Sequence, residues 1–257
     1  MTKKPLILVT NDDSIVAPGI RILIEIANEF GDVYVVAPDG PQSGKSHAIT
    51  LDQSLRCTEV PSDGPQKEYK VSGTPADCVK MAINVVMPRR PDLILSGINH
   101  GSNASVNVIY SGTMSAAVEG ALERIQAIGF SLCEFSWEAS FEAAKPYVRK
   151  VIKATLENGL PSGVCLNVNI PENNKAPYKG MRVCRQAIGN WVEEFDSRID
   201  PFGRPYYWLT GKYENYDHGD DTDIAALEDG YISVVPITVD LTAHHAVATL
   251  NQWNFEK

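Results

Sequence analysis

The chain of 257 residues has 32 acidic and 23 basic side chains, a formal net charge of −9, and 44% hydrophobic residues. This composition excludes a disordered chain, and the acidic balance argues against nucleic-acid-duplex binding and against a polybasic membrane surface, which both need clustered positive charge. No apolar run approaches the roughly 18 residues of a transmembrane helix, and none forms a secretory signal. The five cysteines include no C-x-x-C motif. We therefore expect a cytoplasmic protein with reduced thiols.

The first forty residues predict a strand, a helix and a second strand. Residues 6–10 are a short apolar run that ends in polar residues, as buried parallel strands do. Pro18-Gly19 then precedes apolar residues at helical spacing, and Gly31 provides a C-terminal stop. Residues 33–37 form the second apolar run, so this segment is typical of a βαβ unit.

Alternation of strands and helices continues to residue 171. Residues 48–72 are predicted to be extended, with a break at 62–65. Thr74 is placed to cap the next helix, since Pro75 fits the first helical position. The remaining elements expected in this half are a strand at 93–95, a Gly/Asn/Ser-rich loop at 96–105, a helix at 112–124, a strand at 127–132, a helix at 138–157 and a strand at 164–170.

The pattern changes after residue 171, where helical periodicity fades and aromatic residues become frequent. We expect a β-rich extension, compatible with a long hairpin, over 172–216, weak alternation over 222–236 and a helical end over 241–257. The predicted architecture is an α/β three-layer α/β/α sandwich with a mostly parallel sheet, mixed at the edge. Residues 1–171 would form the Rossmann-like core carrying the active site, and 172–257 the extension and oligomerisation arm of the same compact unit.

Polar residues follow three of the predicted strands. Ligands of open α/β sheets bind beyond the carboxyl ends of the strands, so these three loops are expected to meet at one edge. The polar residues concerned are Asn11, Asp12, Asp13 and Ser14 after the first strand, Ser43 and His47 after the second, and Asn99, His100, Asn103 and Asn107 after the strand at 93–95.

Asp12 and Asp13 are the sharpest feature of this set. Two adjacent carboxylates repel, and burial raises the pKa of each, a cost that a divalent cation removes. The neighbouring hydroxyl and amide oxygens favour Mg²⁺, Mn²⁺ or Ca²⁺ over a thiolate zinc site. Alternatively, Asp12 caps a turn and Asp13 caps the following segment. Residue types alone leave both interpretations open, and the glycines and asparagines of 97–107 favour metal and phosphate binding.

Ser111-Gly112-Thr113 opens a predicted helix and is a candidate phosphate site. Free N–H groups, a hydroxyl and the positive end of the helix dipole attract anions there. An ordinary N-cap role for Ser111 is the commoner alternative and is compatible with phosphate binding. His47 and His100 are weaker candidates, because a lone loop histidine is more often structural than catalytic.

Taken together, these motifs resemble the SurE (survival protein) 5′/3′-nucleotidases. The resemblance rests on segments spread over nearly the whole chain. They are Ile7-Leu8-Val9-Thr10-Asn11-Asp12-Asp13, Val35-Val36-Ala37-Pro38-Asp39 with Gln42-Ser43-Gly44, Ser72-Gly73-Thr74-Pro75-Ala76-Asp77, Ser96-Gly97-Ile98-Asn99, Tyr110-Ser111-Gly112-Thr113, Pro201-Phe202-Gly203 and Asp220-Asp221-Thr222-Asp223.

The resemblance implies one divalent cation per subunit, held by Asp12, Asp13, Ser43 and Asn99. It also implies hydrolysis of nucleoside monophosphates, some activity on short polyphosphate, and a homodimer or homotetramer built partly by exchange of the C-terminal arm. The sequence departs from the family pattern in three places: Ser14 stands where glycine is usual, His100 where arginine is common, and Asn107 where aspartate is common.

The function expected from these residues is metal-dependent phosphomonoester hydrolysis. A metal-activated water would attack phosphorus, with Asp12 and Asp13 as the catalytic carboxylates. The groups expected to bind the phosphate are Asn11, Asn103, Ser111, Gly112 and Thr113. Two alternatives remain open: a covalent aspartyl phosphatase, and a non-catalytic nucleotide- or metal-binding module.

Overall fold

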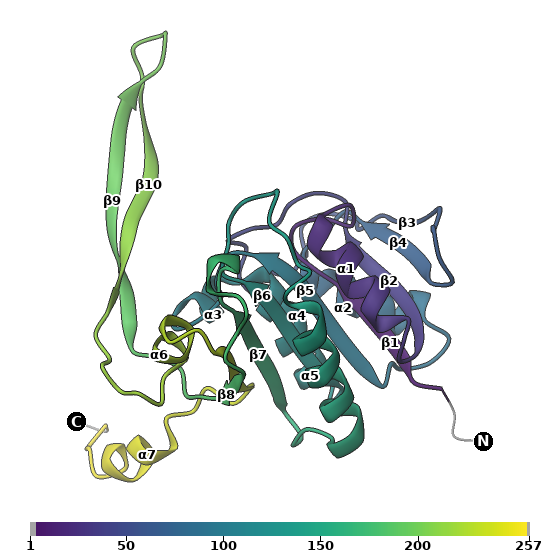
Figure 1. Cartoon of the computed structure of the whole chain (residues 1–257). Coiled ribbons are helices and arrows are strands. Elements are labelled where there is room, and N and C mark those ends of the chain that lie inside the picture. The colour runs from purple at the N-terminus through teal and green to yellow at the C-terminus, as the bar shows by residue number, and fades with distance from the viewer. Residues whose placement is uncertain (1–3, 256–257) are drawn as a thin grey trace.

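A nine-stranded sheet organises the molecule. The computed structural model describes residues 4–255 and confirms the predicted α/β class (Figure 1). Across the sheet the strands are β3 (Cys57–Val60), β4 (Lys67–Val71), β2 (Asp32–Pro38), β1 (Leu6–Thr10), β5 (Leu93–His100), β6 (Gln126–Leu132), β7 (Val164–Ile170), β11 (Ile232–Thr238) and β8 (Met181–Val183). The strands from β4 to β7 run parallel, while β3 and β11 are antiparallel to β4 and β7, so the sheet is mixed towards its edges.

Helices cover both faces of this sheet. α1 (Pro18–Ala27) and α5 (Lys145–Asn158) pack on one face and lie in front in Figure 1. On the other face lie α2 (Pro75–Met81), which continues as the π-helical turn η1 (Ala82–Val86), and α4 (Gly112–Leu122). Successive residues of β1 serve the two faces: Ile7 and Val9 join the core under α1 and α5, and Leu6 and Leu8 join the core under α2 and α4.

Two elements before residue 171 differ from the sequence expectation. The strand expected at 93–95 continues as β5 to His100, because after a bulge between Ser96 and Asn99 it pairs with β6 again. The helix expected from residue 138 begins only at Lys145. Pro146 fits the first turn of a helix and would disrupt a helical interior, which accounts for this later start.

The chain after β7 contributes both to the sheet and to a projecting hairpin. β9 (Gly189–Ile199) and β10 (Pro205–Asn215) form the long hairpin, which extends away from the sheet in Figure 1. The base of the hairpin is tied to the loop after β5, since Trp191 Nε1 donates to Asn107 Oδ1 at 2.8 Å and Tyr213 Oη donates to Ser105 Oγ at 2.6 Å.

Four short helices complete the fold. They are α3 (Asn107–Tyr110), η2 (Asn173–Lys175), α6 (Asp223–Glu228) and α7 (His244–Leu250). The end of the chain is therefore less helical than the expected 241–257, of which residues 256 and 257 lie outside the described part. Within residues 4–255, no helix has the length and apolar character needed to cross a bilayer. All five cysteines are free thiols, as expected.

Candidate active site

The candidate site lies where the strand order reverses. β1 has β2 on one side and β5 on the other, and in such sheets this reversal opens a crevice at the carboxyl ends. Asp12 and Asp13 follow β1 directly and are both buried. The His100 amide donates to Asp13 Oδ2 at 3.2 Å, and the Gln42 amide donates to the Asp12 carbonyl at 2.7 Å. The loops after β1, β2 and β5 therefore meet at the aspartate pair.

Helix α4 begins against the side chain of Asp12. Thr113 Oγ1 donates to Asp12 Oδ1 at 2.5 Å. A Cβ on Gly112 would lie only 2.7 Å from the Asp12 Cβ and 2.8 Å from Oδ2, so the approach requires glycine at this position. The helix N-terminus, with its partial positive charge, thus faces a carboxylate of the chain itself.

Burial raises the pKa values of both carboxyl groups. For Asp12 the pKa is about 6, because burial and then the Asp13 charge disfavour ionisation, while hydrogen bonds from Thr113 act in the opposite direction. Burial also raises the pKa of Asp13, although the His100 amide lowers it in part. Two carboxyl groups whose ionisation is disfavoured in this way bind a cation readily, because positive charge relieves both the desolvation and the repulsion.

Three buried oxygens on β1, on β5 and on the residue after β1 have no hydrogen-bond partner among residues 4–255. They are Asn11 Oδ1, Thr10 Oγ1 and Ser96 Oγ. Asn11 is held by its Nδ2, which donates to the Ser14 carbonyl at 2.7 Å, and Thr10 and Ser96 are paired neighbours on β1 and β5. Buried polar atoms normally bond to protein, water or an ion, so these oxygens fit a hydrated ligand site.

The donor set suits a hard divalent cation. Residues 4–255 contain no cluster of three or more His, Cys, Asp or Glu side chains that could hold a metal. A cation would therefore depend on the two carboxylates together with neutral oxygens. Asn99 Nδ2 donates to the Gly101 carbonyl at 2.9 Å, which leaves Asn99 Oδ1 as an acceptor. Ser43 is exposed and follows Gln42, which is bonded to Asp12. Carboxylate, amide and hydroxyl oxygens are the ligands that Mg²⁺, Mn²⁺ and Ca²⁺ prefer.

The candidate phosphate residues occupy two positions. Ser111 caps α4, since its Oγ accepts the Met114 amide at 3.0 Å. The Thr113 hydroxyl is bonded to Asp12, so this side chain orients the carboxylate. Asn103 instead lies beside the ends of β6 and β7: its Nδ2 donates to Ser131 Oγ at 2.8 Å, and its amide donates to Asn169 Oδ1 at 2.8 Å.

Sequence reasoning missed several buried polar residues near these groups. Asn167 and Asn169 form hydrogen bonds with the backbone of Asn103. The sequence indicates them only as two asparagines at alternate positions of an otherwise apolar strand. Glu119 is buried on α4 between His47 Nε2 at 2.8 Å and Lys80 Nζ at 2.6 Å. His47 thus bonds to Glu119, and it fixes the loop after β2 to α4.

Ser14 has a backbone φ of 101°, in the region that favours glycine. This conformation is one that glycine adopts without strain, so it agrees with the expectation that Ser14 stands at a glycine position. We expect Ser14→Gly to raise the free energy of unfolding by about 1 kcal/mol, because it relieves backbone strain. Ser14→Ala, which keeps the strain, is the matched control. Chemical denaturation of the three proteins tests this, and a lower stability for Ser14→Gly would contradict it.

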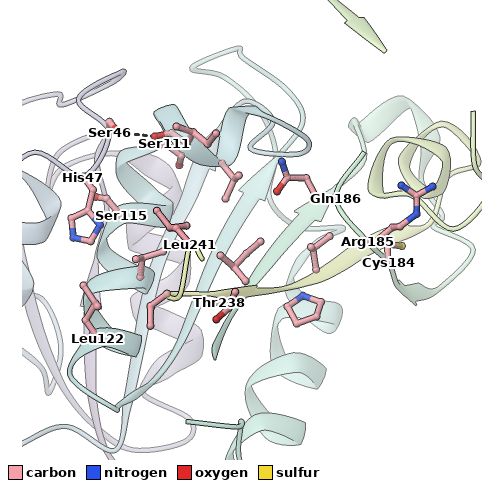
Figure 2. Close-up of a pocket in the computed structure, with 17 residues that line it drawn as sticks. Ser46, His47, Ser111, Ser115, Leu122, Cys184, Arg185, Gln186, Thr238 and Leu241 are labelled. Carbon is pink, nitrogen blue, oxygen red and sulfur yellow. Dashed lines mark hydrogen bonds between the residues drawn. The ribbon is translucent and has the colours of Figure 1, made fainter. Parts of the chain in front are cut away.

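A large apolar cavity adjoins the site at Ser111. Its volume is about 750 Å³, and it lies between α4 and β11 (Figure 2). Val118, Leu122 and Ile237 are among its apolar lining residues, and Ser111, a phosphate candidate, is among its polar ones. Neither Asp12 nor Asp13 lines this cavity, so the cluster of catalytic candidates is outside it.

Comparison with known proteins gives one consistent result. A family model described as survival protein SurE matches residues 7–193. The protein named 5′-nucleotidase SurE from Christiangramia forsetii is 59% identical over 254 residues, covering 98% of each chain. Its counterpart from Flavobacterium johnsoniae is 59% identical over 252 residues, covering 98% of this chain and 97% of the other. The crystal structure of the SurE protein from Aquifex aeolicus has a TM-score of 0.83 at 36% identity and covers 96% of this chain and 98% of that one. The resemblance seen in the motifs is thereby confirmed, and the chain belongs to the survival protein SurE family.

Proposed function

We propose that this protein is a 5′-nucleotidase that depends on a divalent cation and releases phosphate from nucleoside monophosphates. The observation that supports it best is the buried pair Asp12 and Asp13 at the meeting point of three loops, beside the N-terminus of α4. Relatives with 59% identity over nearly the whole chain are named 5′-nucleotidases. Activity on 3′-monophosphates and on short polyphosphate belongs to the same proposal, since all share a terminal phosphoryl group.

In the proposed reaction, water attacks phosphorus and gives a proton to Asp13, the P–O bond to the nucleoside breaks, and the leaving nucleoside oxygen takes up a proton from solvent. A divalent cation held by Asp12, Asp13, Ser43 and Asn99 would lower the pKa of a bound water and screen the phosphate charge. Asp13 orients the attacking water and accepts its proton. Asp12 contributes negative charge at a position fixed by Thr113.

The phosphoryl oxygens would be held by neutral donors. The proposed donors are the side chains of Asn11, Asn103 and Ser111 and the amides of Gly112 and Thr113. Ser111 and the amides of Gly112 and Thr113 lie at the start of the eleven-residue helix α4, whose dipole would favour the negative charge that builds up during attack. No covalent intermediate is required by this scheme.

The test is phosphate release from a panel of nucleoside 5′- and 3′-monophosphates. Activity should be lost with a chelator and return when Mg²⁺, Mn²⁺ or Ca²⁺ is restored singly. Trapping of a phospho-enzyme would instead favour a covalent aspartyl phosphatase. A complete lack of phosphate release with every ion would favour a non-catalytic binding module.

The raised pKa of Asp12 predicts how pH and metal act on stability. In the unfolded chain the group ionises near 3.8, whereas in the folded metal-free chain its pKa is about 6. The folded state therefore favours the protonated carboxyl. Below pH about 4 this preference adds about 3 kcal/mol to the free energy of unfolding of the metal-free chain. The added stability is lost as the pH rises to about 6. We expect Mn²⁺ to raise the melting temperature strongly above pH about 7 and weakly below pH about 5.

Thermal unfolding of wild type and Asp12→Asn, each with chelator and with Mn²⁺, measures this effect. Asp12→Asn serves as the control because it removes the titration at an almost unchanged volume. A cation bound by Asp12 would be contradicted if Mn²⁺ raised the melting temperature of wild type equally at the two pH values. It would also be contradicted if Mn²⁺ raised the melting temperature of Asp12→Asn as much as that of wild type.

We also propose that the protein is a homodimer or homotetramer. Exposed apolar side chains concentrate on the hairpin and on the C-terminal segment; they include Phe195, Tyr207, Trp208, Leu241, Val247, Leu250 and Trp253. Patches of this kind mark protein contacts. Light scattering should give two or four times the chain mass, and Leu250→Asp should reduce it. A monomer at micromolar concentration would contradict the proposal.

A further inference from the structure

The segment between β6 and α5 carries two exposed aromatic side chains beside the end of β5. Phe135 is 79% exposed and Trp137 is 56% exposed. The exposed aromatic residues of the hairpin and the C-terminal segment lie on parts proposed to contact other subunits. Phe135 and Trp137 belong to neither part. Phe135 borders a hollow that Tyr213 and Asn215 of β10 also line, and both aromatic residues contact the end of β5.

Trp137 is connected to Asp13 through one residue. Its ring stacks on the imidazole of His100, with centroids 5.2 Å apart and planes inclined by 15°. Phe141 packs edge-on against the same imidazole at 5.1 Å, and His100 Nδ1 is 2.9 Å from the Ser136 carbonyl oxygen. These contacts fix the imidazole. Because the backbone amide of His100 donates to Asp13 Oδ2, Trp137 rests on a residue that touches the catalytic candidate.

Phe135 reaches the site by a second route. Its ring lies against the backbone of Gly101, where an added Cβ would be only 2.3 Å from the Phe135 Cε1. The carbonyl of the same Gly101 accepts the side-chain amide of Asn99 at 2.9 Å. Phe135 and Asn99, a proposed metal ligand, therefore both contact Gly101. The two aromatic side chains flank the end of β5.

We infer that Trp137 and Phe135, with His100 as the support of Trp137, form the surface on which the nucleobase of the substrate stacks. The inference rests on the proposed nucleotidase function and adds the position of the base. A nucleoside monophosphate consists of a phosphate, a sugar and a planar base, and the phosphate is proposed to bind to the neutral donors beside the aspartate pair. Exposed rings held by neighbouring contacts are suited to such a base because every base has a π-face. Stacking of this kind accepts all bases and favours the larger purines.

The test compares two substrates that differ only by the base, adenosine 5′-monophosphate and ribose 5-phosphate. In wild type, KM should be lower for the nucleotide. Trp137→Ala should raise KM for the nucleotide by about 5- to 100-fold relative to KM for ribose 5-phosphate. Trp137→Phe, which keeps an aromatic face, should restore most of the difference. Phe135→Ala should act in the same direction and provides a second variant should Trp137→Ala fail to fold.

The outcomes separate the two proposals. If wild type releases phosphate from neither substrate, the proposed function is wrong and the inference falls with it. If both substrates are hydrolysed and neither alanine variant changes the ratio of the two KM values, only the inference is overturned. The same holds if the ratio responds instead to Leu122→Trp, which narrows the cavity of Figure 2, because the base would then bind there.

Discussion

Asp13→Asn is expected to lower kcat by at least about 100-fold while the protein remains folded. The carboxylate is proposed to accept the proton of the attacking water, and an amide of nearly the same shape cannot do so. The contact with the His100 amide can persist, since the asparagine oxygen also accepts a hydrogen bond. Steady-state phosphate release at saturating substrate measures the effect.

Asp32→Asn is the matched control for this change. Asp32 begins β2, at the opposite end of the strands from the site, and its exposed carboxylate pairs with Lys4 at 3.1 Å. The kcat of Asp32→Asn should equal that of wild type, because an exposed ion pair contributes little to stability. Retention of more than a tenth of wild-type kcat by Asp13→Asn would remove Asp13 from the proposed mechanism.

Gly112→Ala is expected to have the second-largest effect, about 100-fold on kcat, because a small displacement of a catalytic group has such consequences. The added methyl group would lie 2.7 Å from the Asp12 Cβ and 2.8 Å from its Oδ2, so the carboxylate must move. Alanine has a higher helix propensity than glycine, so the change does not weaken the helix itself. Turnover and Mn²⁺ affinity should fall together.

Gly40→Ala provides the control at a neighbouring loop. A Cβ at Gly40 would meet no atom within 4 Å, and turnover should therefore stay near the wild-type value. If Gly112→Ala retains activity within about threefold of Gly40→Ala, the close approach of α4 to Asp12 has no part in positioning the carboxylate.

The fold was predictable mainly where local pattern and burial agree. Residues 6–9 are continuously apolar because helices cover both faces of β1, and the polar residues from Thr10 onward mark the end of the strand. The extension of β5 to His100 was not predictable in this way. It depends on pairing of Asn99 with Ser131 and of His100 with Leu132, and no local preference of a Gly/Asn-rich segment indicates that pairing.

The candidate site shows the same limit. The predicted strand ends indicated Asp12, Asp13 and Asn99, because the topology of a parallel sheet brings residues at the carboxyl ends of its strands to one edge. The contact between Thr113 and Asp12 joins residues 101 positions apart, so a pattern read along the chain could only suggest a phosphate role for Thr113. Asn169, which bonds to the backbone of Asn103, was likewise visible only as an unexplained polar residue in an apolar strand.

The most direct test of the central claim is calorimetric titration of Mn²⁺ or Mg²⁺ into chelator-treated protein at about pH 7.5, above the pKa of Asp12. The account predicts uptake of one ion per chain by wild type, and little or none by Asp12→Asn and Asp13→Asn. Absence of uptake by wild type, or equal uptake by both variants, would contradict the proposal that these neighbouring carboxylates hold the cation.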